Sequence, residues 1–271
     1  MPEQPPYPVE RIAYGADASQ FGDLRLPLAP TDASRAPYPI VIVIHGGYWR
    51  ARYDLEYFGV GCNALATLGL ATWNLEYRRM GNPGGGWPGT FADVASAADY
   101  LRTLAQHYPL DLMRVVTLGH SAGGHLACWL AARHRISAGS ELYCADPLPI
   151  HGVVSLAGVV DLRRAWELGL SSNATGLLLG GSPDEAHDRY AAASPYDLLP
   201  LGVAQRLIHG TKDDSVPYEI SERYVARARE LGDDATLMAL SGAGHFEPVE
   251  PPSREWQIVA QTAVGLIRSS P

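Results

Sequence analysis

Four stretches of the sequence place polar side chains beside glycine, directly after apolar runs. The first is TLGHSAGG at 117–124, in which Ser121 stands between Gly119 and Gly123 and follows the candidate strand Arg114 to Leu118. Glycines at these two positions remove the Cβ atoms that would clash in a sharp strand-to-helix turn, and such a turn presents a serine hydroxyl at the top of a sheet. Helix capping is the ordinary alternative role of serine. The setting predicts that Ser121 is a nucleophile.

A serine hydroxyl becomes an effective nucleophile when a histidine takes its proton. His245, in SGAGHFE, follows the apolar run Ala235 to Leu240. We therefore predict that it lies in a loop after the last strand and acts as this base. Structural or lining roles are expected for four other histidines: His45 in a glycine loop, His120 and His125 beside Ser121, and His209 at a strand end.

The carboxylate that orients such a histidine is expected between the serine and the histidine in the chain. The stretch HGTKDDSVP follows the candidate strand Arg206 to Ile208 and offers Asp213 and Asp214. We predict Asp213, whose role would be to fix the imidazole and stabilise the imidazolium. Asp214 remains the competitor, and Asp161 is a third candidate for which a cap or turn role is expected.

A second glycine pair, in HGGYW at 45–49, follows the continuous apolar run YPIVIVI at 38–44. Glycine lets backbone N–H groups approach a developing negative charge without steric cost. We predict an oxyanion hole made of the N–H groups of Gly47 and Ala122, with Tyr48 as a further candidate donor.

Two tryptophans near predicted strand ends, Trp49 and Trp87, are predicted to offer an apolar wall to a substrate, with core packing as the alternative. The loop GNPGGGWPG at 81–89 lacks the Lys-Ser/Thr pair of a phosphate-binding loop. The three cysteines form no CxxC pair and have no histidine at zinc-finger spacing. We therefore expect no cofactor and no metal.

These residues must be positioned by alternating strands and helices. Glycines at 69 and 232 stand where helices are expected to end. The predicted strands are 11–14, 23–27, 38–44, 71–77, 114–118, 152–156, 206–208 and 235–240. The predicted helices are 55–68, 90–107, 122–134 and 218–231.

The alternation predicts an α/β fold with a mostly parallel sheet, helices on both faces and an antiparallel pair at the N-terminal edge. A chain of 271 residues fits one domain, 1–271. The irregular region 161–200, rich in Leu, Gly, Ser and Ala, is expected to form a small helical, cap-like insertion. Ligands of open α/β sheets bind at the carboxyl ends of the strands, so this insertion would shape a pocket there.

Charge and composition narrow the classes of partner. Acidic residues outnumber basic ones by 29 to 21, the net charge is −8, and Lys212 is the only lysine. This balance disfavours nucleic acid and anionic membrane surfaces as partners. The N-terminal stretch does not resemble a secretory signal and no run of 18 apolar residues occurs, so we expect a cytoplasmic protein that acts on a small molecule. The oligomeric state is left open.

The motifs VIHGGYW, GHSAGGH, HGTKDDSVP and GAGHFE, in this order, resemble the α/β-hydrolase superfamily over nearly the whole chain from about Val9. HGGYW is similar to the HGGxW pattern of the branch that contains kynurenine formamidase (arylformamidase) and small carboxylesterases. The resemblance implies a sheet of about eight strands and hydrolysis of a small ester, a formamide or another activated amide through an acyl-enzyme. The alternatives are a peptidase-like amidase, a non-catalytic binding protein, and lyase or perhydrolase chemistry on the same scaffold.

Overall fold

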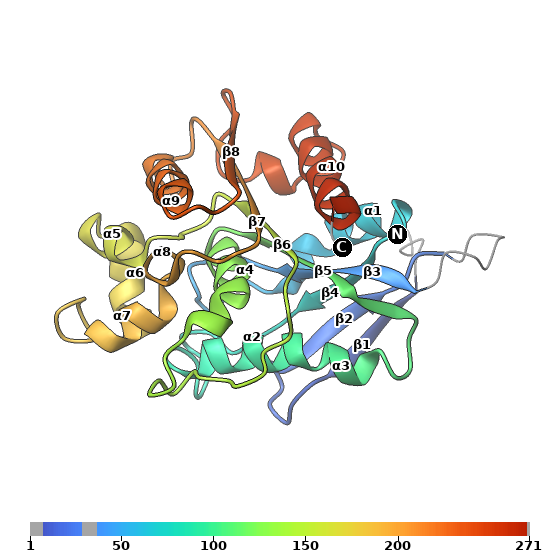
Figure 1. Cartoon of the computed structure of the whole chain (residues 1–271), viewed down its shortest axis with the longest axis horizontal. Helices are drawn as coiled ribbons and strands as arrows, with labels where there is room; N and C mark the ends of the chain where they lie inside the picture. The colour runs from blue at the N-terminus through green and yellow to red at the C-terminus, as the bar shows by residue number, and fades with distance from the viewer. Residues whose placement is uncertain (1–7, 29–36, 270–271) are drawn as a thin grey trace.

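The computed structural model describes residues 8–28 and 37–269. These residues form an eight-stranded sheet in the order β1-β2-β4-β3-β5-β6-β7-β8 (Figure 1). The pairs β1–β2 and β2–β4 are antiparallel, and all the other neighbours are parallel. The strands are β1 Val9–Ala13, β2 Phe21–Arg25, β3 Tyr38–Ile44, β4 Ala71–Leu75, β5 Leu110–His120, β6 Gly152–Leu156, β7 Ala204–Gly210 and β8 Ala235–Leu240.

The predicted strands are all present, and β3, β6 and β8 have the predicted bounds. The strand β5 is longer than predicted because Tyr38 and Pro39 of β3 pair with residues 110 and 111, ahead of a register shift between Pro39 and Ile40. The mostly parallel sheet and the antiparallel N-terminal edge confirm the predicted α/β class. The N-terminal stretch on which the prediction about secretion depends lies mainly outside the described residues.

Strand β3 shows why the centre of the sheet is apolar throughout. All seven of its residues are buried. Ile40, Ile42 and Ile44 pack into one hydrophobic core, and Val41 and Val43 pack into another on the opposite face. A strand that is covered on both faces has no solvent-facing side, so its sequence reads as a continuous run instead of an alternation.

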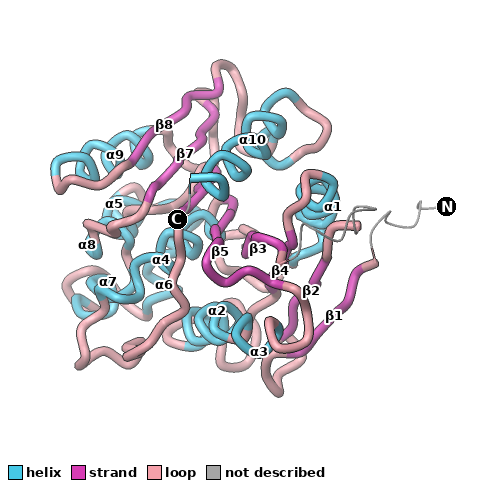
Figure 2. The backbone as a smooth tube through the Cα atoms, turned by 45° about the vertical axis from the view of Figure 1, so that its right-hand side comes forward, coloured by secondary structure: helices cyan, strands magenta, loops and turns pink. Residues whose placement is uncertain are grey.

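Helices cover both faces of this sheet (Figures 1 and 2). Residues of α1 and α10 share the core that contains Val41, whereas residues of α2, α4 and α9 share the core that contains Ile42. The bounds are α1 Gly59–Thr67, α2 Gly89–Asp99, α3 Leu101–Leu104, α4 Ala122–Ala132, α9 Glu219–Glu230 and α10 Arg254–Ser269, with short 3₁₀ helices η2 Leu55–Phe58, η3 Arg133–Arg135 and η4 Glu247–Val249. The helix α10 is absent from the predicted elements, while Gly69 and Gly232 do adopt the positive φ that ends a helix.

The region 161–200 contains four helices, α5 Leu162–Glu167, α6 Leu170–Leu179, α7 His187–Ala193 and α8 Pro195–Leu198. Figure 1 shows them grouped at the left of the molecule. Within α6, Ser171 to Asn173 turn in the left-handed sense, with φ between 49° and 55°. Arg50 Nη2 donates a hydrogen bond of 2.6 Å to the carbonyl oxygen of Ser171 and so ties this turn to the loop after β3.

Candidate active site

Ser121 lies in the turn between β5, which ends at His120, and α4, which begins at Ala122. Its φ of 57° and ψ of −120° are rare for a residue with a side chain. The turn is so tight that a Cβ atom on Gly119 would lie 2.0 Å from the carbonyl oxygen of Gly123. A Cβ atom on Gly123 would lie equally close to the carbonyl oxygen of Ile44. Both glycines of GxSxG are therefore required by the geometry of this turn.

His245 and Asp213 are in direct contact. The distance from His245 Nδ1 to Asp213 Oδ2 is 2.7 Å, and the Asp213 side chain is fully buried. The other carboxylate oxygen, Oδ1, accepts hydrogen bonds of 2.8 Å from the N–H groups of Ser215 and Val216. Asp214 is exposed and its Oδ1 accepts the Ser215 hydroxyl, at 3.2 Å. Of the two candidate acids, Asp213 is therefore the one that the fold brings to His245.

A second histidine, His209 at the end of β7, also reaches this carboxylate. Its Nε2 donates to the carbonyl oxygen of Val216 at 3.0 Å and lies 3.2 Å from Asp213 Oδ2, while its Nδ1 accepts the Ser221 hydroxyl at 2.8 Å. Burial alone would raise the pKa of Asp213, but the hydrogen bonds from His209 and His245 outweigh it and hold this pKa below the ordinary carboxyl range. The sequence predicts that the hydrogen bonds of His209 are satisfied, but it did not predict the contact with Asp213. The available signal was the spacing of four residues between His209 and Asp213.

The loop after β3 approaches Ser121 very closely. A Cβ atom on Gly46 would lie 2.7 Å from the carbonyl oxygen of His120 and 3.0 Å from Ser121 Cβ. Gly47 follows with a φ of 105°, and it lines the same cavity as Ser121. Ala122 is the first residue of α4, so its N–H has no partner within the helix. The N–H groups predicted to bind an oxyanion thus lie in the two segments that flank Ser121.

Tyr48 has a φ of 49°, and its hydroxyl donates a 2.5 Å hydrogen bond to the carbonyl oxygen of Ser215. Burial, with a smaller contribution from Asp213, raises the pKa of Tyr48 to about 12. The hydroxyl therefore stays protonated near neutral pH. This contact joins the loop after β3 to the loop that carries Asp213.

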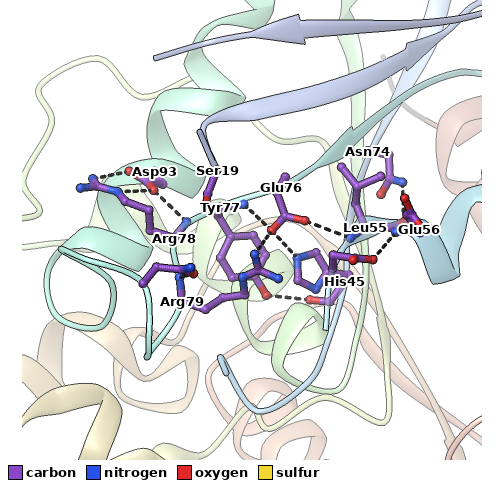
Figure 3. A network of polar contacts seen from close by, with 12 residues as sticks. Ser19, His45, Leu55, Glu56, Asn74, Glu76, Tyr77, Arg78, Arg79 and Asp93 are labelled. Atoms are coloured by element: carbon purple, nitrogen blue, oxygen red, sulfur yellow. Dashed lines mark hydrogen bonds and ion pairs between the residues drawn. The ribbon is translucent and has the colours of Figure 1, made fainter. Parts of the chain in front are cut away.

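Behind the loop after β3 lies a buried polar network (Figure 3). His45 Nδ1 lies 2.9 Å from the carbonyl oxygen of Gly46, and His45 Nε2 lies 3.3 Å from Glu76 Oε1. The Glu76 carboxylate also accepts hydrogen bonds from the N–H groups of Leu55 and Tyr77. It forms an ion pair with Arg79 at 2.9 Å. His45 is fully buried and holds the glycine loop, as the sequence predicted.

Ser121 and His245 both line a cavity of about 360 Å³. Its aromatic walls come from Tyr48, Tyr53, Tyr57 and Phe246. Charged groups at this cavity belong to Arg52 and Glu250. The sequence did not identify Tyr53, Tyr57 and Phe246, and it identified Tyr48 only as a candidate oxyanion donor; the direction of Tyr48 depends on the left-handed turn of the loop after β3.

The two tryptophans lie elsewhere. Trp49 is fully buried, and its Nε1 donates to His125 Nδ1 at 3.2 Å. Trp87 Nε1 donates to Glu141 Oε1 at 3.0 Å, and neither tryptophan is among the residues that line the cavity with Ser121. The aromatic side chains of this cavity belong to the tyrosines and Phe246, whereas Trp49, with a φ of 55°, points into the core.

Within residues 8–28 and 37–269, no group of three or more His, Cys, Asp or Glu side chains is arranged to hold a metal ion. None of the helices there combines the length and the apolar character that crossing a bilayer requires.

Asp161, the third candidate acid, caps α5 through a 3.0 Å hydrogen bond from the Arg164 N–H.

Known proteins resemble this chain in sequence. The chain is 24% identical over 247 residues to the probable isoprenylcysteine alpha-carbonyl methylesterase ICME of Oryza sativa subsp. japonica, a match that covers 87% of this chain and 57% of that protein. It is 34% identical over 293 residues to the non-reducing polyketide synthase Preu6 of Preussia isomera, covering 82% of this chain and 13% of the synthase. The chain thus spans less than two thirds of either relative.

Solved structures resemble the fold. A truncated carbohydrate esterase from gut microbiota matches with a TM-score of 0.82 at 22% identity, over 99% of both chains. Esterase 2 of Thermogutta terrifontis, phosphoramylated by tabun, matches with a TM-score of 0.77 at 20% identity, over 98% of this chain and 96% of that one. At this identity the likeness establishes the fold, which is that of the α/β-hydrolases.

The family model described as BD-FAE matches residues 26–227, which include Ser121 and Asp213 and end before His245. This span is well over half of the chain. The chain therefore belongs to the BD-FAE family and has the α/β-hydrolase fold.

Proposed function

We propose that this protein is a serine esterase that uses Ser121, His245 and Asp213 as a catalytic triad. The observation that carries the proposal is the strained turn of Ser121 beside a cavity that it shares with His245, whose Nδ1 contacts the buried Asp213 carboxylate at 2.7 Å. The esterases named among the relatives and neighbours support the reaction class.

In the first half of the reaction, Ser121 Oγ attacks the carbonyl carbon of the ester while His245 Nε2 takes the hydroxyl proton. Asp213 keeps the proton on His245 Nδ1 and stabilises the imidazolium that forms. The N–H groups of Gly47 and Ala122, with that of Tyr48, donate hydrogen bonds to the oxyanion. The tetrahedral intermediate then collapses, and His245 gives its proton to the departing alcohol, which leaves an acyl-serine.

In the second half, water takes the place of the alcohol. His245 removes a proton from the water as its oxygen attacks the acyl carbon, and the same N–H groups hold the second oxyanion. Collapse releases the carboxylic acid and returns the proton to Ser121 Oγ. Each proton-transfer step uses the same imidazole, so no other titratable group is needed in the cavity.

The cavity favours small substrates with a planar apolar part. Its volume of about 360 Å³ accommodates a compact ester, and three tyrosines and Phe246 provide faces for aromatic groups. Aryl esters and aryl formamides share this shape. Hydrolysis of N-formyl arylamines, the activity implied by the arylformamidase resemblance, is therefore included in the proposal as its narrower form.

The test compares the wild-type protein with Ser121→Ala on p-nitrophenyl esters of two to eight acyl carbons and on N-formyl-kynurenine. A fluorophosphonate probe, followed by peptide mapping, reports the modified residue without requiring the right substrate. We expect labelling at Ser121 and loss of ester turnover by about four orders of magnitude or more in Ser121→Ala. Unchanged turnover in a folded Ser121→Ala protein would exclude the mechanism.

The same assays separate the rival functions. Preferred cleavage of the formamide would assign the arylformamidase activity, and turnover of the esters alone would assign a carboxylesterase. Cleavage of aminoacyl anilides would favour the peptidase-like amidase. A folded protein that is neither labelled nor active would favour a binding protein on a hydrolase scaffold.

A further inference from the structure

A chain of hydrogen bonds crosses the floor of the candidate active site and uses two side chains that have no role in the triad. The Gly46 N–H donates to the hydroxyl of Tyr57, a residue of η2, and this hydroxyl contacts His120 Nδ1 at 3.2 Å. On the other side of the ring, His120 Nε2 lies 2.9 Å from the carbonyl oxygen of His245.

The direction of each hydrogen bond follows from its partners. A carbonyl oxygen only accepts, so the proton of His120 is on Nε2 and is donated to His245. The other ring nitrogen, Nδ1, is then an acceptor and receives the Tyr57 hydroxyl proton. The Tyr57 oxygen in turn accepts the Gly46 N–H. The chain therefore runs in one direction, from the loop after β3 to the loop after β8.

His120 stays neutral in this setting. Burial, reinforced by the neighbouring His245, lowers the pKa of His120 to about 3. Its ring lies 4.5 Å from the His245 ring, at an angle of 45°. With both nitrogens engaged, His120 has no free atom with which to act as the base.

We propose that His120 and Tyr57 are positioning residues that hold the oxyanion loop and the His245 loop in place around Ser121. The inference rests on the proposed esterase function and deepens it. The chain ends on the residue before Gly47 at one side and on His245 at the other, and His120 is covalently joined to Ser121. A displacement of about 1 Å in such groups lowers the rate by about 100-fold.

Three substitutions test the chain. His120→Phe keeps a ring and removes both hydrogen bonds, His120→Gln keeps a donor for the His245 carbonyl, and Tyr57→Phe removes the hydroxyl. We expect His120→Phe to lower kcat by about 10- to 100-fold with KM changed by less than about threefold, because the loss falls on the alignment of reacting groups. His120→Gln should recover most of kcat, and Tyr57→Phe should lower it by about tenfold.

The double variant examines whether the two residues act as one chain. In His120→Phe the Tyr57 hydroxyl still accepts the Gly46 N–H but no longer connects it to the His245 loop, so adding Tyr57→Phe should lower kcat by clearly less than it does in the wild type. Fully multiplicative losses would show that the two residues act independently and would overturn the chain. Tyr190→Phe is the matched control, since it removes the hydroxyl of a buried tyrosine that contacts the Gly181 carbonyl oxygen at 3.2 Å, away from the cavity.

The rate of Ser121 labelling by the fluorophosphonate distinguishes failure of this inference from failure of the proposed function. If the wild-type protein is not labelled at Ser121, the proposed function fails, and the positioning role fails with it. If the wild type is labelled and His120→Phe is labelled equally fast, only the positioning role fails. Circular dichroism and urea unfolding of each variant show whether a loss reflects unfolding; if His120→Phe does not fold, His120→Gln and Tyr57→Phe still separate the two ends of the chain.

Discussion

The histidine–carboxylate pairs His245–Asp213 and His45–Glu76 differ in what the second ring nitrogen of the histidine can reach. In one pair, His245 contacts Asp213 through Nδ1, and the residue lines the cavity that contains Ser121. In the other, His45 contacts Glu76 through Nε2, and its Nδ1 lies against the Gly46 carbonyl oxygen. The first pair opens onto this cavity, and the second does not.

This difference indicates which pair affects the reaction and which affects the stability of the fold. Arg79 completes the closed pair with an ion pair to Glu76, and hydrogen bonds from two backbone N–H groups fill the remaining carboxylate positions. Burial would raise the pKa of Glu76, but the contacts with His45 and Arg79 lower it overall. We infer that the open pair contributes to the reaction rate and the closed pair to the stability of the loop that holds the oxyanion.

The largest expected effect falls on the open pair. Asp213→Asn keeps the shape of the side chain but no longer fixes the tautomer of His245, so we expect kcat to fall by about 10⁴-fold. Steady-state kinetics on a p-nitrophenyl ester measure this loss. Asp214→Asn, at the exposed neighbouring position, should change kcat by less than about twofold. An equal loss in both variants would contradict the assignment of Asp213.

Disrupting the closed pair of His45 and Glu76 should lower the free energy of unfolding. Glu76→Gln leaves Arg79 buried without its counter-charge, so we expect the free energy of unfolding to fall by about 3–5 kcal/mol. Urea unfolding measures it. Glu167→Gln removes the carboxylate from a surface pair with Arg164 and should cost less than about 1 kcal/mol. If Glu76→Gln stopped turnover at unchanged stability, the division between the two pairs would be wrong.

A third kind of histidine, represented by His120 and His125, has no carboxylate in hydrogen-bond contact, and burial is the largest cause of its pKa shift. Burial lowers the pKa of His125 to about 4 and that of His120 to about 3, whereas both would titrate near 6.5 in the unfolded chain. Between these values the unfolded chain binds more protons, so stability is full above about pH 6.5 and falls as the pH is lowered. The expected slope is about 1.4 kcal/mol per pH unit for each histidine.

Urea unfolding between pH 7.5 and pH 5 measures this slope. His125→Gln removes one of the two titrating groups and should reduce the slope by about half. His187→Gln, at an exposed position of α7, is the control and should leave the slope unchanged. A slope that does not change in His125→Gln would mean that other groups dominate the acid sensitivity.

The smallest effect is expected where a carboxylate has no histidine partner. Asp161 accepts the Arg164 N–H at the start of α5, so Asp161→Ala should lower the free energy of unfolding by about 1 kcal/mol and leave kcat unchanged. Thermal unfolding in parallel with the exposed Asp184→Ala measures the difference. A large loss of kcat in Asp161→Ala would show that this cap affects the cavity and would contradict its purely structural role.

The sequence was most informative where one local pattern decides the structure. The continuous apolar run of β3 predicts a strand buried on both faces, and the glycines around Ser121 predict a tight strand-to-helix turn. The helix α10 was also within reach, because Trp256, Val259, Ala260 and Ala263 recur at helical spacing and are buried.

The cavity walls could not be derived in the same way. Whether Tyr48 or Trp49 faces the cavity depends on two successive positive φ angles, which no propensity indicates for these residues. The chain through Tyr57 and His120 joins segments that are distant in sequence. Such contacts follow from tertiary packing and leave no periodic signal.

The placement of His245 has a consequence for how the protein would lose activity. The loop that carries it follows β8, which is the last strand of the sheet and pairs only with β7 among the described strands. Edge elements open locally at lower free energy than the centre of a sheet. Detachment of this one strand would remove the base while leaving Ser121 and most of the helices intact. On heating, ester turnover should therefore be lost at a lower temperature than the circular-dichroism signal of the helices. The loss of turnover would then report the opening of the sheet edge.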